Sequence, residues 1–215
     1  MRAPKIQKIF DRFKAANPQP KTELAYTTPF ELLVATMLSA QATDVSVNKA
    51  TRILFPIANT PEAMVALDVE GLMPYLQTLN LYRTKTKNVV AMSQKLLDEF
   101  KGEVPGNREA LVTFPGVGRK TANVVLNAAF GQPTIAVDTH IFRVSNRIGL
   151  APGKTVEAVE QKLLKVVPKE YLHEAHHWLV LHGRYVCTAR KPQCWNCLIA
   201  DLCVFKPKTP KPKDV

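Results

Sequence analysis

The chain has 215 residues, 46% of them hydrophobic, so it can bury one large hydrophobic core or two smaller ones. Its 29 lysines and arginines outnumber 18 acidic residues, and the formal charge of +11 favours nucleic acid as the partner. No apolar run approaches the roughly 18 residues of a membrane span, and the first residues lack the pattern of a signal peptide. We therefore expect a cytoplasmic protein, nucleoid-associated in a bacterium, that has no membrane partner.

Apolar residues recur at helical spacing along nearly the whole chain, and no alternating strand pattern persists, which predicts an all-α protein. Thr28 precedes one helical segment and Glu31 follows three residues later, as at a capped helix start. The turn residues at 131–133 mark the best internal boundary. In chain order, the segments predicted to be helical are 6–13, 29–40, 45–55, 61–67, 71–78, 82–99, 108–113, 119–130, 139–148, 155–166 and 171–186.

Two of these predicted helices, 108–113 and 119–130, are joined by a turn that contains Gly116 and Gly118, and both glycines are free to adopt positive φ. Such a turn can direct its backbone N–H groups, together with those of the following helix N-terminus, at one phosphate. A nucleotide-binding P-loop does not fit, because its lysine directly follows a glycine and a strand precedes the loop. A purely structural turn between two helices is the alternative.

Lys120 stands in the first turn of the helix predicted at 119–130, at the positive end of the helix dipole. A cation is unfavourable there by roughly 0.3–1 kcal/mol, so the position favours the neutral amine, which is the nucleophilic form. We expect Asn123 and Asn127 on the same side of the helix, facing a DNA groove. Lys120 is thus a candidate nucleophile, and the alternative is that it binds a phosphate as a simple charge.

Asp138 follows the apolar run TIAV and precedes the helix predicted at 139–148. Its simplest role is that of a helix N-cap, which needs only one carboxylate oxygen. A catalytic role is compatible with capping, because the second oxygen of the carboxylate can face a site.

All four cysteines lie between residues 187 and 203, at the spacing C-x6-C-x2-C-x5-C. This confinement predicts metal ligation, since nothing marks the chain as a secreted protein with disulfides. Zinc and an iron–sulfur cluster both remain open, and the single C-x2-C pair favours the cluster. The loop between the first two cysteines carries Arg190 and Lys191, which suit a phosphate contact. The candidate metal ligands are Cys187, Cys194, Cys197 and Cys203.

These motifs occur in the order found in the endonuclease III family of helix-hairpin-helix DNA glycosylases, which the chain resembles. They are LSAQATD at 38–44, FPGVGRKTANVVLN at 114–127, AVDTH at 136–140 and the cysteine set. The resemblance extends from Pro29 to Cys203, and the combination of motifs is highly specific. One departure is Phe114, where the family usually has leucine, and this residue should alter the packing beneath the hairpin.

The resemblance implies two helical domains. The first is a six-helix barrel over residues 22–132 that includes the helix-hairpin-helix motif. The second combines residues 1–21 and 133–215 and carries a 4Fe-4S cluster bound by the four cysteines. Within the second domain, the lysine-rich and proline-rich segment 206–215 is predicted to be a flexible basic tail.

The resemblance also implies an activity, that of a bifunctional DNA glycosylase and AP lyase in base excision repair. Its partner would be double-stranded DNA that contains oxidised pyrimidines or abasic sites, and the protein would act as a monomer. Lys120 matches the lysine that attacks C1′, expels the base and forms a Schiff base before β-elimination cuts the strand 3′ to the lesion. Asp138 matches the aspartate to which we assign proton handling and oxocarbenium stabilisation.

Further family positions would contact DNA. Gln41 matches the residue that fills the space left by the flipped base, and Leu79 with Leu81 resembles the apolar wedge that supports unstacking. The other expected DNA contacts come from the hairpin, the AVDTH motif and the cysteine loop: Pro115, Gly116, Val117, Gly118, Arg119, His140, Arg190 and Lys191.

Two other functions remain as alternatives. A non-enzymatic DNA-binding module would bind DNA without cleaving it, and a monofunctional glycosylase would release the base without nicking the strand. The sister branch of adenine glycosylases generally lacks the lysine and carries an extra C-terminal domain. The presence of Lys120 therefore favours the lyase branch.

Overall fold

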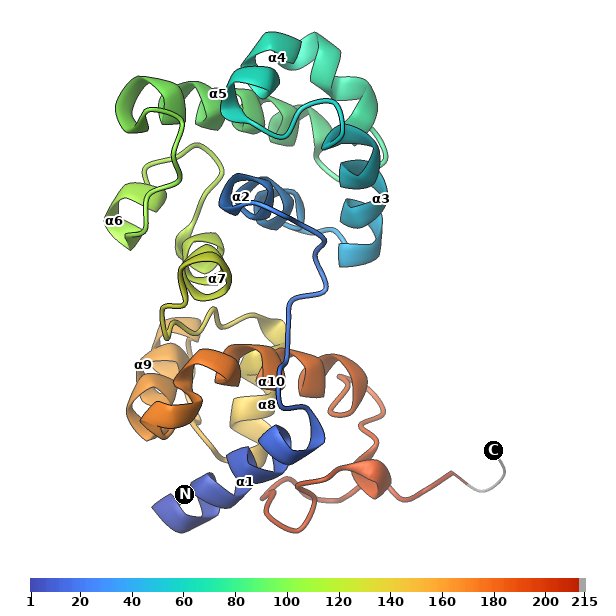
Figure 1. The fold of residues 1–215 in the computed structure, drawn as a ribbon. Coiled ribbons are helices and arrows are strands. Elements are labelled where there is room, and N and C mark those ends of the chain that lie inside the picture. Colours follow the sequence, from blue (N-terminus) through green and yellow to red (C-terminus); the bar gives the residue numbers. More distant parts are fainter. Residues whose placement is uncertain (213–215) are drawn as a thin grey trace. The chain divides into compact units, whose positions relative to one another are not determined.

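The computed structural model describes residues 1–212 (Figure 1). This part is all-helical, as predicted, with ten α-helices, two short 3-10 helices and no strand. None of its helices combines the length and hydropathy that crossing a membrane requires. The chain forms two compact units, one of residues 22–132 and one that joins residues 1–21 to the chain from residue 133 onward. Each unit has a hydrophobic core of its own.

The unit of residues 22–132 is built around α2, whose nine residues after Pro29 are all buried. Figure 1 shows α2 end-on, with the other helices of the unit around it. Phe114 is buried and packs edge-to-face on Phe100, with the ring centroids 5.3 Å apart. The larger side chain at this family position therefore fills the core beneath the hairpin. The helices are α2 (Pro29–Leu38), α3 (Asp44–Leu54), α4 (Pro61–Leu76), α5 (Tyr82–Phe100), α6 (Arg108–Leu111) and α7 (Arg119–Phe130).

Local hydrogen bonds explain where these helices begin and break. The predicted cap of α2 is present, because the Glu31 N–H donates to Thr28 Oγ1 at 3.1 Å. Helix α4 is interrupted at Asp68, which has φ of 53° and lies between the segments predicted at 61–67 and 71–78. Asp68 Oδ1 accepts the N–H groups of Glu70 and Gly71, so this carboxylate caps the second half of α4.

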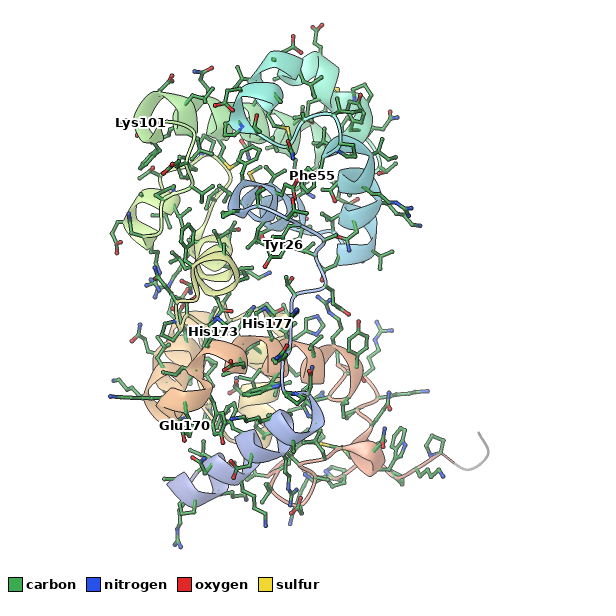
Figure 2. All side chains as sticks on the ribbon, viewed as in Figure 1. Tyr26, Phe55, Lys101, Glu170, His173 and His177 are labelled. Carbon is green, nitrogen blue, oxygen red and sulfur yellow. The ribbon has the colours of Figure 1, made fainter. Side chains whose placement is uncertain are left out.

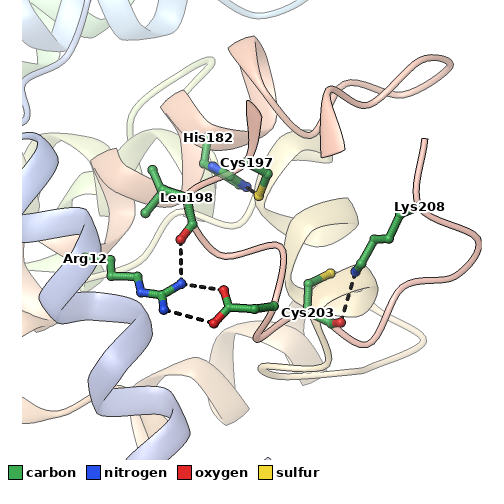
Figure 3. A network of polar contacts seen from close by, with 7 residues as sticks. Arg12, His182, Cys197, Leu198, Cys203 and Lys208 are labelled. Carbon is green, nitrogen blue, oxygen red and sulfur yellow. Dashed lines mark hydrogen bonds and ion pairs between the residues drawn. The ribbon is translucent and has the colours of Figure 1, made fainter. Parts of the chain in front are cut away.

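The other unit contains both ends of the described chain. Helix α1 places Phe13 parallel to Trp178 with centroids 6.4 Å apart, and the indole Nε1–H donates to the Asn17 carbonyl at 2.8 Å. Arg12 of α1 pairs with Asp201 in the cysteine segment (Figure 3). Residues far apart in sequence therefore close this unit. Its helices are α1 (Ala3–Ala16), α8 (Thr139–Ile148), α9 (Val156–Val166), η1 (Lys169–Tyr171), α10 (Leu172–Tyr185) and η2 (Cys194–Asn196).

Helix α10 contains a buried histidine whose protonation opposes folding. Figure 2 labels His173 and His177 on this helix. Burial and, to a smaller extent, the neighbouring His173 together lower the pKa of His177 to about 4, while Glu174 acts in the opposite direction. Between pH 6.5 and 4 the unfolded chain therefore binds a proton that the folded chain does not, so stability falls as the pH falls.

We expect the wild type to lose about 2 kcal/mol of unfolding free energy between pH 6.5 and 5 relative to His177→Gln. The variant lacks the group that titrates, so its stability should depend less on pH over this interval. Denaturant unfolding of both proteins at several pH values measures the difference. A parallel decline in the two proteins would show that His177 does not carry the effect.

Candidate functional site

The turn between α6 and α7 requires one of its two glycines for conformational reasons. Gly116 has φ of 78°, and a Cβ built there would lie 2.7 Å from Asn88 Nδ2 and 2.9 Å from Met37 Sδ. Gly118 has φ of −92°, which any residue can adopt. Of the two glycines that are free to adopt positive φ, only Gly116 does so.

The role of Gly118 lies instead in the space around it. It is the N-cap of α7, no side chain caps this helix start, and an added Cβ would meet no atom of the described chain within 4 Å. Neither packing nor backbone conformation explains this glycine. The absence of a side chain leaves the N–H groups of the first turn of α7 open to the close approach of an anion.

Val117 packs in the interior of the hairpin. Its side chain is buried, and its N–H donates to the Phe114 carbonyl at 3.0 Å. The turn itself therefore uses this donor, and the expectation that Val117 contacts DNA is wrong for both its side chain and its N–H. Pro115, Gly116, Gly118 and Arg119 remain as candidate contacts of the hairpin.

Lys120 is exposed in the first turn of α7. Its amine makes no hydrogen bond or ion pair with residues 1–212, and the first turn contains no acidic residue. The field of the helix N-terminus is therefore not offset by a neighbouring carboxylate in that turn. The amine is therefore free to reach an electrophile that does not belong to the described chain.

Asn123 and Asn127 do not share the surface of Lys120. Both side chains are buried, which contradicts the prediction that they face a DNA groove. Asn123 Oδ1 accepts the Arg108 Nε–H at 2.8 Å, and Asn127 Nδ2 donates to the Gln132 carbonyl at 3.2 Å. Buried amides need such partners, and these two tie α7 to α6 and to the segment after α7.

Two exposed residues of this unit, Gln41 and Leu81, adopt the left-handed conformation with φ of 54° and 58°. This conformation is costly for residues other than glycine and is concentrated at functional sites. Asn80 links the two segments, because its Nδ2 donates to the Gln41 carbonyl at 3.0 Å. The structure thus brings together two residues that the sequence analysis assigned to base flipping. Sequence reasoning missed Asn80, whose only signal is a polar residue between two leucines.

Leu79 and Leu81 have different environments. Leu81 is 57% exposed, whereas Leu79 is 3% exposed and belongs to the core of residues 22–132. The prediction that Leu79 contacts DNA directly as part of an apolar wedge is therefore wrong. Leu81 alone presents an apolar side chain at this point of the surface.

Asp138 belongs to the other unit and caps α8, as predicted. Its Oδ1 accepts the Ile141 N–H at 2.8 Å, and its second oxygen makes no hydrogen bond with residues 1–212. His140 follows in the first turn of α8, where its Nδ1 lies 3.2 Å from Arg143 Nη2. Because a guanidinium only donates, Nδ1 is the acceptor in this contact.

The four cysteines line one cavity in the same unit, together with His182 and Phe205. All four are free cysteines, which excludes a disulfide among them in this structure. Burial raises the pKa of the Cys197 thiol, and the three neighbouring sulfurs raise it further. Four thiolates can share this space only if a cation neutralises them, so the donor set fits a thiolate-bound metal centre.

A cluster of several irons suits this arrangement. In a four-iron cluster, four cysteine thiolates surround a shared centre rather than converge on a single ion. Cys187, Cys194, Cys197 and Cys203 likewise surround one common cavity.

His182 contacts this set and was not predicted. Its Nε2 lies 3.7 Å from Cys197 Sγ (Figure 3), and burial lowers the pKa of His182 to about 4, so the ring is neutral near pH 7. A metal-bound thiolate only accepts hydrogen bonds, so in that state the ring donates from Nε2. The signal in the sequence is a histidine in the helix that precedes Cys187.

The loop after Cys187 presents two cations. Arg190 and Lys191 are exposed, and Thr188 Oγ1 donates to the Lys191 carbonyl at 2.8 Å, which closes the loop. The predicted basic surface is therefore directly connected to the first cysteine.

Comparisons with known proteins agree with these features. Residues 34–169 match the family of HhH-GPD superfamily base excision DNA repair proteins, and residues 187–203 match the iron-sulfur binding domain of endonuclease III. Endonuclease III of Escherichia coli K12 is 60% identical over 208 residues, which cover 97% of this chain and 99% of the relative.

Two solved structures resemble the fold closely. A non-covalent endonuclease III–DNA complex matches with a TM-score of 0.89 and 43% identity, and a trapped endonuclease III–DNA covalent intermediate with 0.88 and 43%. Each match covers 95% of this chain and 96% of the solved chain.

Proposed function

The chain belongs to the endonuclease III family of the HhH-GPD superfamily of base excision DNA repair proteins, and we propose that Lys120 is the nucleophile of its reaction. It is a DNA glycosylase with AP lyase activity, and a 4Fe-4S cluster is its cofactor. One observation carries the assignment of Lys120. Its amine is exposed and unpaired within the described chain, at the positive end of the helix that follows the hairpin.

In the proposed reaction, the neutral Lys120 amine attacks C1′ of the flipped nucleotide, and the bond from C1′ to the base breaks. Ring opening and loss of a proton from nitrogen leave a Schiff base between Lys120 and C1′. Removal of a C2′ proton then expels the 3′ phosphate, which cuts the strand by β-elimination. Borohydride reduces the Schiff base and leaves the protein joined to the DNA.

Asp138 supports this reaction through its second carboxylate oxygen. The first oxygen is held by the Ile141 N–H, which fixes the orientation of the carboxylate. A fixed negative charge can stabilise the positive charge that develops on the sugar as the base leaves. The same group can accept and return a proton during the transfers between amine, base and sugar.

Gln41 and Leu81 are proposed to enter the duplex when the damaged nucleotide leaves the stack. Leu81 offers an exposed apolar wedge, and Gln41 offers an amide that can both donate to and accept from the base left without a partner. Flipping costs a few kcal/mol and is cheapest where pairing is already weak. The left-handed backbone conformation of both residues supports this role, because such strain is concentrated at functional sites.

The remaining contacts are proposed to bind phosphates. The hairpin offers the N–H groups of Gly116 and Gly118 and the Arg119 side chain, the cysteine loop offers Arg190 and Lys191, and His140 lies two residues after Asp138. Pro115 has no N–H, so it can contact the DNA backbone only through its apolar ring. These groups position the duplex and carry no information about its sequence. The net charge of +11 adds long-range attraction to the DNA. We place the protein, as a monomer, on the nucleoid in the cytoplasm of a bacterium.

The proposed lesions are oxidised pyrimidines and abasic sites in double-stranded DNA. To test this, the wild-type protein is incubated with duplexes that carry thymine glycol, an abasic site, 8-oxoguanine or no lesion, with and without borohydride. We expect covalent complexes and nicks with thymine glycol and the abasic site only. Release of base without nick or covalent complex would indicate a monofunctional glycosylase. Binding without reaction would indicate a DNA-binding module.

The two hairpin glycines should respond differently to alanine. Gly118→Ala places a Cβ in open space but puts the less favourable alanine at an N-cap, so we expect a loss of no more than about 1 kcal/mol of unfolding free energy. We also expect about tenfold weaker DNA binding and a salt dependence reduced by about one phosphate contact. In Gly116→Ala, the alanine must adopt positive φ and its Cβ lies too close to Asn88 and Met37. We therefore expect a loss of about 1–3 kcal/mol of unfolding free energy. Salt titrations of binding and denaturant unfolding measure the two effects. Wild-type affinity in Gly118→Ala would contradict the proposed phosphate contact.

A further inference from the structure

Arg147 of α8 joins its helix to the first cysteine and to the basic loop. Its Nη1 lies 3.7 Å from Cys187 Sγ and 2.7 Å from the Thr188 carbonyl, and its Nη2 donates to the Ala189 carbonyl at 2.7 Å. The guanidinium also packs on the ring of Phe205, 4.8 Å from its centroid. One side chain therefore contacts a cysteine sulfur and the main chain of the two following residues.

These contacts match the chemistry of a guanidinium. Arginine is permanently charged and carries its donors in a planar fork, so it can serve several acceptors at once. A thiolate is an acceptor, and a hydrogen bond from a cation to it is stronger than one between neutral groups. The two carbonyls lie in the segment that leads to Arg190 and Lys191, so the fork also restrains the position of that loop.

A cation at a ligand sulfur also affects the redox properties of a cluster. Hydrogen bonds to the sulfurs and the local charge set the reduction potential of iron–sulfur clusters. Reduction adds one negative charge, and a fixed positive charge nearby stabilises the reduced form. Removing that charge should therefore shift the potential to more negative values.

Arg143 provides a natural comparison within the same helix. It lies four residues before Arg147, and its Nε donates to the Cys187 carbonyl at 2.9 Å while its Nη2 donates to the Gly183 carbonyl at 2.7 Å. Arg143 thus has the same charge and binds the main chain of the same cysteine. Its hydrogen bonds reach carbonyl oxygens and the His140 ring, and none reaches a sulfur among residues 1–212.

We propose that Arg147 is a positioning residue that fixes Cys187 as a cluster ligand and holds the following loop in its DNA-binding conformation. This inference rests on the proposed function, in which Cys187 binds the cluster and Arg190 with Lys191 contacts DNA. Arg147 couples the cluster to the loop through direct contacts. Its charge raises the reduction potential of the cluster, and its fork sets the geometry of the loop.

The test compares full-length, cluster-loaded wild type with Arg147→Gln, Arg147→Lys and Arg143→Gln. The readouts are the visible absorbance of the cluster, its midpoint potential by voltammetry and its rate of loss in a chelator. Arg147→Gln should shift the potential to more negative values and lose the cluster about 10- to 100-fold faster, the usual range for groups that orient ligands. Arg147→Lys should restore part of the potential, because the charge remains, and Arg143→Gln should shift it less.

A second readout is affinity for a duplex with an uncleavable abasic-site analogue. Arg147→Gln and Arg147→Lys should both bind more weakly than wild type, because neither side chain has the planar fork of donors that fixes both carbonyls. If Arg147→Gln does not fold, the lifetime of the cluster and the DNA affinity of Arg147→Lys still test the inference. Unchanged potential, cluster lifetime and DNA affinity in the Arg147 variants would overturn the inference. A wild type without a cluster or without DNA binding would instead overturn the proposed function on which it rests.

Discussion

Lys120→Ala is expected to abolish the borohydride-trapped protein–DNA complex and to lower strand cleavage at an abasic site by at least about 10³-fold, as for loss of a catalytic nucleophile. The alanine variant has no amine that can form a Schiff base from this position. DNA affinity should change by only a few-fold, because the hairpin and the basic loop remain. Covalent trapping, nicking and binding are measured on the same abasic-site duplex.

Lys101→Gly is the matched control for this variant. It removes the same charge from the same unit, at an exposed position with φ of 55° that favours glycine over lysine. Trapping and cleavage should stay near wild type in the control, which separates the loss of a nucleophile from the loss of one positive charge. Preserved nicking in Lys120→Ala would exclude Lys120 as the nucleophile. An equal loss in both variants would assign the effect to charge.

The helices were predictable because their signals are local. The Thr28 cap acts within one turn of its helix, and the break at Asp68 depends on the N–H groups two and three residues after it. The turn at Gly116 needs positive φ, which a glycine in the sequence permits. The cap at Asp138 is equally local. Such features depend only on residues that are close in sequence, so they can be predicted from a single sequence.

Burial was harder to predict, because it depends on the rest of the fold. Asn123 and Asn127 share a helical face with Lys120 by spacing, yet their amides are buried against Arg108 and Gln132. Leu79 and Leu81 look alike in sequence, but only Leu81 is exposed. A polar residue can satisfy a buried neighbour and an apolar residue can remain at the surface. Helical periodicity alone does not distinguish these cases.

Contacts between distant parts of the sequence were not predictable at all. Arg12 pairs with Asp201 and donates to the Leu198 carbonyl, which anchors the cysteine segment to the first helix (Figure 3). Arg147 reaches the loop after Cys187 in the same way. Neither arginine stands out among the 29 basic residues of the chain. The cysteine spacing identified the ligands, whereas the side chains that support them required the structure.

Cys194→Ser should remove the visible absorbance of the iron–sulfur cluster and most of its iron. Serine replaces a soft thiolate by a hydroxyl, which is a poor ligand for iron in such a cluster. Because metal binding contributes to folding, the segment of residues 187–203 should become more susceptible to proteolysis, and DNA affinity should fall with the loss of its basic loop. Absorbance, metal analysis and limited proteolysis measure these effects.

Ala189→Ser is the control, since it adds a hydroxyl to the same exposed loop and leaves all four cysteines in place. It should retain the cluster and bind DNA as the wild type does. Most of the helical signal of Cys194→Ser should also persist, because residues 22–132 have a separate core that contains none of the cysteines. Full absorbance in Cys194→Ser would remove this cysteine from the ligand set. Zinc in place of iron in the wild type would overturn the cofactor itself, and the C-x6-C-x2-C-x5-C spacing would then describe a structural zinc site.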